Sequence, residues 1–224
     1  MPTFTADEAL QYDNRIMRLV PGYELLHQVC AAQLAVLLPD EANILVVGAG
    51  SGTEICLLAK LNPKWRFTAQ DISADMLAIA QARFEACGIS ERVSLYAEDV
   101  SSLVQRKQFD VALCLLVMHF VPDNGAKSAL LQAINQRLKP HGHLFFADLM
   151  QPQTLFERDA QLNVCRELGL SEIGVTRMRD NFANEFFPLD KMRMHELFEK
   201  AGYSLPRPFF KVLGFHGYVT QVQG

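Results

Sequence analysis

The stretch Asn43-Ile-Leu-Val-Val-Gly-Ala-Gly-Ser-Gly-Thr53 is a short apolar run that ends in three glycines at alternate positions. A continuous apolar run of this length is typical of a strand that is buried on both faces of a sheet. The glycines permit a sharp turn and let a ligand approach the backbone without meeting a Cβ atom. The stretch therefore predicts a strand, a ligand-binding loop and the start of a helix, in that order.

Further stretches with the character of buried strands follow this one and alternate with helical segments. The helical segments are rich in Ala, Leu and Met or have apolar residues spaced by three and four. This alternation predicts an α/β fold with a doubly wound, Rossmann-like sheet that is mostly parallel and has helices on both faces. The expected strands are Trp65–Gln70, Val93–Ala97, Phe109–Cys114 and Gly142–Ala147, and the expected helices are Met76–Ala86, Ser128–Leu138 and Met192–Lys200.

The remaining parts of the chain are expected to extend this one domain of 224 residues. Residues 1–40 predict a helical N-terminal cap with a break at Val20-Pro21-Gly22-Tyr23. Residues 150–190 predict a helical insertion that serves as a lid or a subunit contact. The stretches Phe209–Leu213 and His216–Val222 predict two closing strands, and their tight connection makes them antiparallel to each other.

Charge and cysteine content narrow the class of protein. The chain has 21 Lys and Arg against 25 Asp and Glu, which gives a formal net charge of −4. Proteins that bind nucleic acid through a general basic surface need clustered Lys and Arg, so no extended nucleic-acid-binding surface is expected. The five cysteines are scattered without a CxxC pair, which predicts no metal site and reduced thiols, as in a cytoplasmic protein.

Targeting and membrane segments are not expected either. The first residues are acidic and polar and have no apolar signal-peptide region. The longest apolar run, Val111–Val121, is interrupted by His119 and falls short of the roughly 20 residues that a membrane span needs. We therefore expect a cytoplasmic protein without a membrane partner.

Two acidic residues follow the expected second and third strands. Asp71 lies 23 residues after Gly48, where a carboxylate can accept both ribose hydroxyls of a nucleoside. The alternative is that Asp71 and Ser73 cap the next helix. Asp99 can accept the exocyclic amine of adenine while the following backbone N–H meets a ring nitrogen, or it can lie in a solvated turn.

The expected fourth and fifth strands also end in polar residues. The fourth continues into Cys114-Leu-Leu-Val-Met-His-Phe120, beside the point where ligands bind in open α/β sheets. His119 is a candidate general base, a candidate substrate ligand or a packed core residue. Asp148 ends the fifth strand, where it either faces the substrate or caps the next segment.

The order of these pieces resembles that of the class I S-adenosylmethionine-dependent methyltransferases. The resemblance includes the segment Arg137-Leu-Lys-Pro-His-Gly142 and the closing strand pair. The resemblance covers nearly the whole chain. It implies a seven-stranded sheet whose last strand is antiparallel, and S-adenosylmethionine as the cofactor. The chain departs from the family at Val46, where the first strand often carries an acid, so the cofactor's amino group needs another anchor.

The resemblance also assigns roles to individual residues. It implies a cofactor site composed of Gly48, Ala49 and Gly50 along the methionine part, Asp71 at the ribose, Asp99 and Val100 at the adenine, backbone of Leu115 at the amino-acid end, and Ile72 and Met76 as further cofactor-binding residues.

A narrower resemblance concerns Arg18-Leu-Val-Pro-Gly-Tyr23, which is similar to the N-terminal segment of the carboxy-S-adenosylmethionine synthases of tRNA wobble uridine modification. It implies that Tyr23 contacts the cofactor. The arginine that binds the extra carboxylate in that group is replaced here by Leu197, with Arg193 a turn away. We therefore expect the ordinary cofactor and keep carboxy-S-adenosylmethionine synthesis as the alternative.

The expected activity is methyl transfer to a small-molecule acceptor, with His119 as the base and Tyr12 or Tyr23 as further candidates. A cofactor-binding protein without catalysis is another alternative. A nicotinamide oxidoreductase is a weaker one, because Thr53 replaces the third glycine of the dinucleotide fingerprint. Family analogy adds the expectation of a homodimer through residues 150–190.

Overall fold

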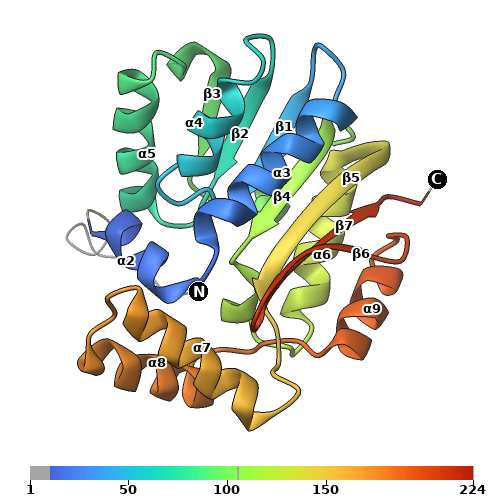
Figure 1. Cartoon of the computed structure of the whole chain (residues 1–224). Helices are drawn as coiled ribbons and strands as arrows, with labels where there is room; N and C mark the ends of the chain where they lie inside the picture. Colours follow the sequence, from blue (N-terminus) through green and yellow to red (C-terminus); the bar gives the residue numbers. More distant parts are fainter. Residues whose placement is uncertain (1–10, 105, 224) are drawn as a thin grey trace.

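The computed structural model describes residues 11–104 and 106–223, and within them the chain forms a seven-stranded sheet in the order β3-β2-β1-β4-β5-β7-β6 (Figure 1). Strands β1 to β5 run parallel, and β7 is antiparallel to both of its neighbours. The predicted sheet, with its antiparallel last strand, is therefore confirmed. The strands are β1 (Asn43–Val47), β2 (Arg66–Gln70), β3 (Val93–Tyr96), β4 (Phe109–Leu115), β5 (Leu138–Leu149), β6 (Arg207–Val212) and β7 (Phe215–Gln221).

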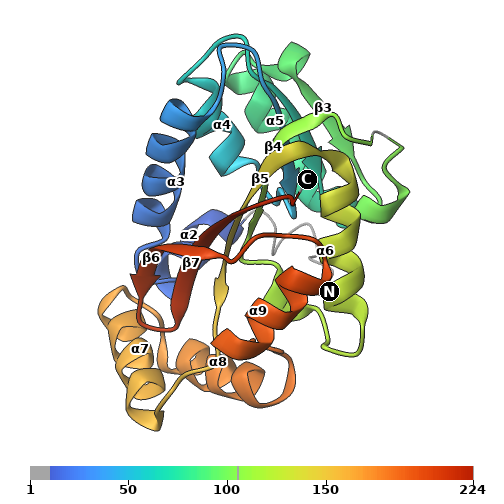
Figure 2. The ribbon, with the colours of Figure 1, turned by 90° about the vertical axis from the view of Figure 1, so that its right-hand side faces the viewer.

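Helices cover both faces of the sheet, as expected (Figure 2). The strand β1 shows why its sequence is continuously apolar: Ile44 and Val46 pack into one core cluster, and Leu45 and Val47 pack into the other. One face is covered by α3 (Tyr23–Leu37), α4 (Thr53–Ala59) and α5 (Ala74–Ala86), and the other by α6 (Ala126–Arg137) and α9 (Lys191–Lys200).

The strand β5 begins at Leu138 rather than at the expected Gly142. Its register against β4 shifts between Phe109 and Val111, so residues 138–141, which precede the expected strand, form a bulged part of it. Gly142 is needed there, because a Cβ atom would lie 2.9 Å from the carbonyl oxygen of Lys139. The sequence pattern predicted the regular part of this strand and missed its irregular start.

The additions to the sheet gather at the edge where β1 to β5 end (Figure 1). They are α2 (Tyr12–Leu19), α7 (Leu155–Glu167) and α8 (Glu172–Asn184). The chain breaks between α2 and α3 at Gly22, which has a φ of 79°, as the sequence predicted. Residues 1–10 of the expected N-terminal cap lie outside the described residues. In the part of the chain that is described, no helix is long and apolar enough to cross a membrane.

Candidate cofactor and active site

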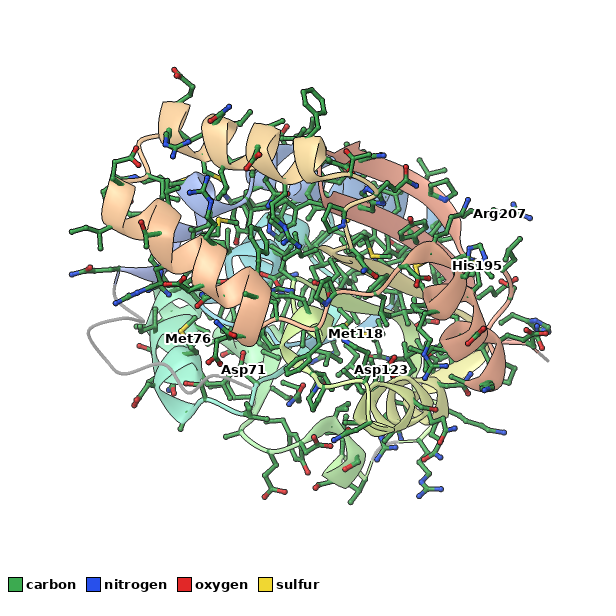
Figure 3. The ribbon with its side chains drawn as sticks, turned by 90° about the horizontal axis from the view of Figure 1, so that it is seen from below. Asp71, Met76, Met118, Asp123, His195 and Arg207 are labelled. Carbon is green, nitrogen blue, oxygen red and sulfur yellow. The ribbon has the colours of Figure 1, made fainter. Side chains whose placement is uncertain are left out.

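A cavity of about 820 Å³ opens at the carboxyl edge of the parallel strands. Its size falls in the range of small-molecule sites in proteins. The glycine loop and the strand tips form its floor, and α2 and α8 form the opposite wall. Seen from below, Asp71 and Met76 lie close together on one side, and Met118 lies nearer the middle (Figure 3).

The glycine loop leads from β1 into α4 with a backbone that other residues cannot adopt without strain. Gly48, Gly50 and Gly52 all have positive φ. A Cβ atom on Gly52 would lie 2.5 Å from the ring of Phe84, and one on Gly48 would collide with Val117. Gly48 and Gly50 line the cavity, so the loop presents bare backbone to whatever occupies it.

Asp71 stands at the tip of β2 and also lines the cavity. Its Oδ2 accepts a hydrogen bond from the backbone N–H of Gly50 at 2.9 Å, and its Oδ1 accepts one from Ser73 at 2.9 Å. Burial raises the pKa of this carboxyl, while the backbone donors lower it. The cap of α5 is Ser73, whose Oγ accepts from the N–H of Met76, so Asp71 itself is not the cap. Lone pairs remain on both oxygens for ribose hydroxyls.

Asp99 lies at the tip of β3, exposed and in the cavity wall. Its Oδ1 accepts from the N–H of Ser101 at 2.8 Å and caps the short turn η2 (Val100–Ser102). Asp99 can cap this turn and bind adenine at the same time, because its Oδ2 has no recorded partner among the described residues. The remaining predicted cofactor residues in the wall are Ile72, Met76, Val100 and Leu115.

The structure leaves Ala49 and Tyr23 out of the cavity wall. The N–H of Ala49 donates to the carbonyl of Gln70 at 2.9 Å, which ties the loop to β2. Tyr23 is buried at the start of α3, with its ring edge-on to that of His27 at 4.5 Å. Their predicted cofactor contacts stay predictions. Tyr12, the other tyrosine candidate, does line the cavity.

His119 lies in the turn η3 (Met118–Phe120), and Asp148 at the end of β5 holds it. The ring Nδ1 pairs with Asp148 Oδ1, and the backbone N–H of His119 donates to Oδ2 at 2.9 Å. The N–H of Leu149 also donates to Oδ1 at 2.7 Å. Asp148 therefore neither faces the substrate nor caps a helix, since its buried carboxylate positions the histidine.

The other side of the His119 ring faces the cavity. A carboxylate partner can only accept, so Nδ1 carries the proton and Nε2 is left as the basic nitrogen. The structure records no hydrogen bond to Nε2 from a described residue. The rings of Phe120 and Phe186 lie 4.0 Å and 4.9 Å from the imidazole, between centroids. This arrangement suits a general base in an apolar pocket.

A buried lysine under this turn was not anticipated. Lys127 is fully buried, and its Nζ donates to the carbonyl oxygen of Met118. Burial lowers the pKa of Lys127, and the nearby Asp148 and Asp123 raise it. The lysine thus fixes the backbone that carries His119. The sequence offered no signal for it, because the lysine precedes the helix that the pattern predicted.

A second unanticipated network fastens α2 to the glycine loop. Arg83 on α5 pairs with Asp13 on α2 and donates to the hydroxyl of Thr53. The hydroxyl of Ser51 donates to Asp13 Oδ1 at 2.6 Å. These bonds hold α2 across the opening of the cavity.

The residues that bear on a carboxylated cofactor lie elsewhere. Leu197 is buried in the core cluster between β5 and α9. Arg193 pairs with Asp123 at 2.8 Å and with Glu196 at 3.0 Å. Neither residue lines the cavity. Among the described residues there is also no group of His, Cys, Asp and Glu side chains that could hold a metal ion.

The strand order and the glycine loop define a Rossmann-like methyltransferase fold. Residues 45–144 match a family model described as a methyltransferase domain. The chain therefore resembles the class I S-adenosylmethionine-dependent methyltransferases over these residues, and their fold implies use of S-adenosylmethionine.

Individual relatives extend the likeness over nearly the whole chain. The carboxy-S-adenosyl-L-methionine synthase of Campylobacter jejuni subsp. doylei is 24% identical over 226 residues, covering 97% of this chain and 92% of the relative. Magnesium protoporphyrin IX methyltransferase from Synechocystis PCC 6803 superposes with a TM-score of 0.68 at 16% identity, over 92% of this chain and 86% of that one. A methyltransferase from Methanosarcina mazei superposes with a TM-score of 0.64 at 20% identity, over 85% of this chain and 97% of that one.

Proposed function

We propose that this protein transfers the methyl group of S-adenosylmethionine to a small-molecule acceptor. The observation that carries the proposal is that His119, with a free Nε2, lines the same cavity as the glycine loop and Asp71. A cofactor held by the loop and the strand tips would present its reactive end toward the histidine, since β4 leads from the cofactor floor into η3.

The bound cofactor supplies a sulfonium methyl group, which is a strong electrophile. The protein's own work is to position the acceptor and exclude water. The helices α2 and α8 cover the cavity, and the network of Asp13 with Arg83 and Ser51 keeps α2 closed over it. The wall around His119 is apolar and aromatic, with Leu116, Phe120 and Phe186.

His119 would take the proton of the acceptor as the new bond to carbon forms. Asp148 would hold the ring in the required tautomer and stabilise the imidazolium that results. The Nδ1–Asp148 pair and the Lys127–Met118 bond limit movement of the histidine. A histidine that was packed only for stability would not need its second nitrogen open to a cavity.

Carboxy-S-adenosylmethionine synthesis is the second candidate, because the full-length relatives carry that name. Leu197 and Arg193 do not support it, since neither reaches the cavity. Mass spectrometry of the cofactor that copurifies with the protein distinguishes the two. The proposal expects S-adenosylmethionine or its demethylated product, and a cofactor bearing an extra carboxyl group would favour the second candidate.

A calorimetric titration with S-adenosylmethionine and S-adenosylhomocysteine tests the proposal directly. We expect micromolar binding that Asp71→Ala weakens tenfold or more, about 1.4 kcal/mol. Asp75→Ala is the matched control, because Asp75 lies in the first turn of α5 and outside the cavity wall. Absence of binding to either ligand by the folded wild-type protein would overturn the proposal.

We also propose that the insertion of residues 150–190 mediates a homodimer. Light scattering coupled to size-exclusion chromatography tests this independently of the activity, and a monomer at micromolar concentration would contradict it.

A further inference from the structure

The charges in the cavity wall are distributed unevenly. Among the described residues, its carboxylates are Asp71 and Asp99, both at the strand tips on the cofactor side. The opposite wall carries Arg15 and Arg18 from α2 and Arg177 from α8. A ligand that spans the cavity therefore meets acceptors at one end and cations at the other.

The three arginines come from two different helices. Arg15 and Arg18 belong to α2, which is fastened to the glycine loop through Asp13 and Ser51, and Arg18 lies beside Gly169. Arg177 comes from α8 and is separate from that network. One turn later Asn181 also lines the cavity, and residues spaced by four share a helix face.

Arg177 and Asn181 are not engaged elsewhere in the described part of the chain. The structure records no ion pair for Arg177 there, whereas its neighbours on α7 and α8 are paired: Arg166 with Glu172 at 2.7 Å, and Arg179 with Asp159 at 3.8 Å. The side chain of Asn181 likewise has no recorded partner among the described residues. A guanidinium and an amide on one face form a donor set for a carboxylate.

Between this donor set and His119 the wall is apolar and aromatic. Met178 lies on the same helix, and Phe186 follows it with its ring edge-on to His119. Phe120 also contacts the imidazole, and its ring lies 5.4 Å from that of Phe186 at an angle of 79°. These packed aromatic side chains form an apolar surface against which a planar ring can pack.

We propose that the methyl acceptor is a hydroxylated aromatic carboxylic acid. Its ring packs against Phe120 and Phe186, its carboxylate binds Arg177 and Asn181, and its hydroxyl meets Nε2 of His119. The hydroxyl proton passes to Nε2, and the oxygen forms a bond to the methyl carbon. The carbon–sulfur bond breaks with its electron pair going to sulfur, which leaves a methyl ether and S-adenosylhomocysteine.

The inference rests on the proposed function, so the experiment first measures the binding of S-adenosylhomocysteine. The folded protein is saturated with S-adenosylhomocysteine and then titrated with 4-hydroxybenzoate or with 4-hydroxybenzamide, which has the same shape and no charge. We expect the acid to bind at least tenfold more tightly than the amide. Arg177→Gln should remove this preference by weakening the binding of the acid tenfold or more. The affinities for the amide and for S-adenosylhomocysteine should stay within twofold of the wild-type values.

Arg179→Gln is the matched control, because Arg179 lies on the same helix but outside the cavity wall, and it should behave as the wild type. Equal affinity for acid and amide, or no binding of the acid to the protein saturated with S-adenosylhomocysteine, would overturn the inference and leave the proposed function standing. Loss of S-adenosylhomocysteine affinity in Arg177→Gln would also overturn it, since Arg177 would then serve the cofactor. Failure of the wild type to bind S-adenosylhomocysteine would overturn both.

Discussion

The carboxylate of Asp148 holds His119 at two points, the ring Nδ1 and the backbone N–H. The two residues lie 29 positions apart in the chain and meet because β4 and β5 are adjacent parallel strands that end at the same edge. A single carboxylate thus fixes both the ring and the turn that carries it. The position of the histidine and the stability of the fold are therefore coupled at this point.

Asp148→Asn should lower the free energy of unfolding by about 1–3 kcal/mol, because one of the two accepting oxygens becomes an NH2 group that faces the donors of His119 or Leu149. Urea denaturation monitored by circular dichroism measures the change. Asp180→Asn replaces an exposed carboxylate of α8 and should change the stability by less than about 0.5 kcal/mol. Equal losses of stability in the two variants would contradict a stabilising role for the hydrogen bonds of Asp148.

Glu54 gives the fold a specific pH dependence. Burial raises its pKa from 4.5 to about 7. Between these pH values the unfolded chain releases a proton that the folded chain retains, so this residue makes the protein less stable as the pH rises from 4.5 to 7. Glu54→Gln removes this loss, which amounts to about 3 kcal/mol.

Urea denaturation of the wild type and of Glu54→Gln at pH 5 and pH 7.5 checks this prediction. The difference in unfolding free energy between the two proteins should change by most of that amount, in favour of the variant at the higher pH. Glu41→Gln, at an exposed position, should follow the wild type at both values. Parallel stability changes in wild type and Glu54→Gln would rule out a raised pKa at Glu54.

Gly48→Ala should abolish binding of S-adenosylmethionine and destabilise the fold. The new Cβ atom would collide with Val117, and the residue would keep a positive φ of 69°. Gly88→Ala is the control, because Gly88 has a φ of 68° with no atom within 4 Å of a Cβ position. The control variant should lose about 1–2 kcal/mol from backbone strain alone and retain full binding. Binding by Gly48→Ala at wild-type affinity would contradict the close packing of the loop.

Asp13→Ala should loosen α2, because Asp13 joins this helix to Arg83 and Ser51. Hydrogen exchange of the α2 amides should become faster, and the affinity for S-adenosylhomocysteine should fall, while exchange in the central strands stays unchanged. Glu24→Ala, at an exposed position in the first turn of α3, provides the comparison. Unchanged exchange in α2 would show that the helix is held by its apolar contacts instead.

The parts of the fold that were predictable are those that local sequence specifies. The run from Asn43 to Thr53 predicted β1, the loop and the start of α4, because apolar continuity and glycine spacing are local properties. The positions of Asp71 and Asp99 at strand ends were predictable for the same reason, since Asp71 directly follows β2 and Asp99 comes three residues after the end of β3. The start of β5 was not, because its bulge depends on how Leu138 meets Phe109 in the neighbouring strand.

The side chains that organise the site depend on contacts between distant segments. His119 and Asp148 were each singled out, but nothing in their spacing showed that they bind each other. The role of Arg83 could not be predicted, because its partners Asp13 and Thr53 lie far from it in the chain. The role of Lys127 could not be predicted either, because this residue precedes the expected helix. Tyr23 was assigned to the cofactor by analogy, and in the structure it packs against His27.

The place of β7 in the sheet has a consequence for biosynthesis. This strand, Phe215–Gln221, lies between β5 and β6 and bonds to both along its length. While the ribosome is still making residues before 215, β5 has an open edge and the aromatic side chains of β6 have no partner strand. The nascent chain therefore exposes an aggregation-prone edge until residues 215–221 emerge from the exit tunnel, and we expect general chaperones to bind it during that interval.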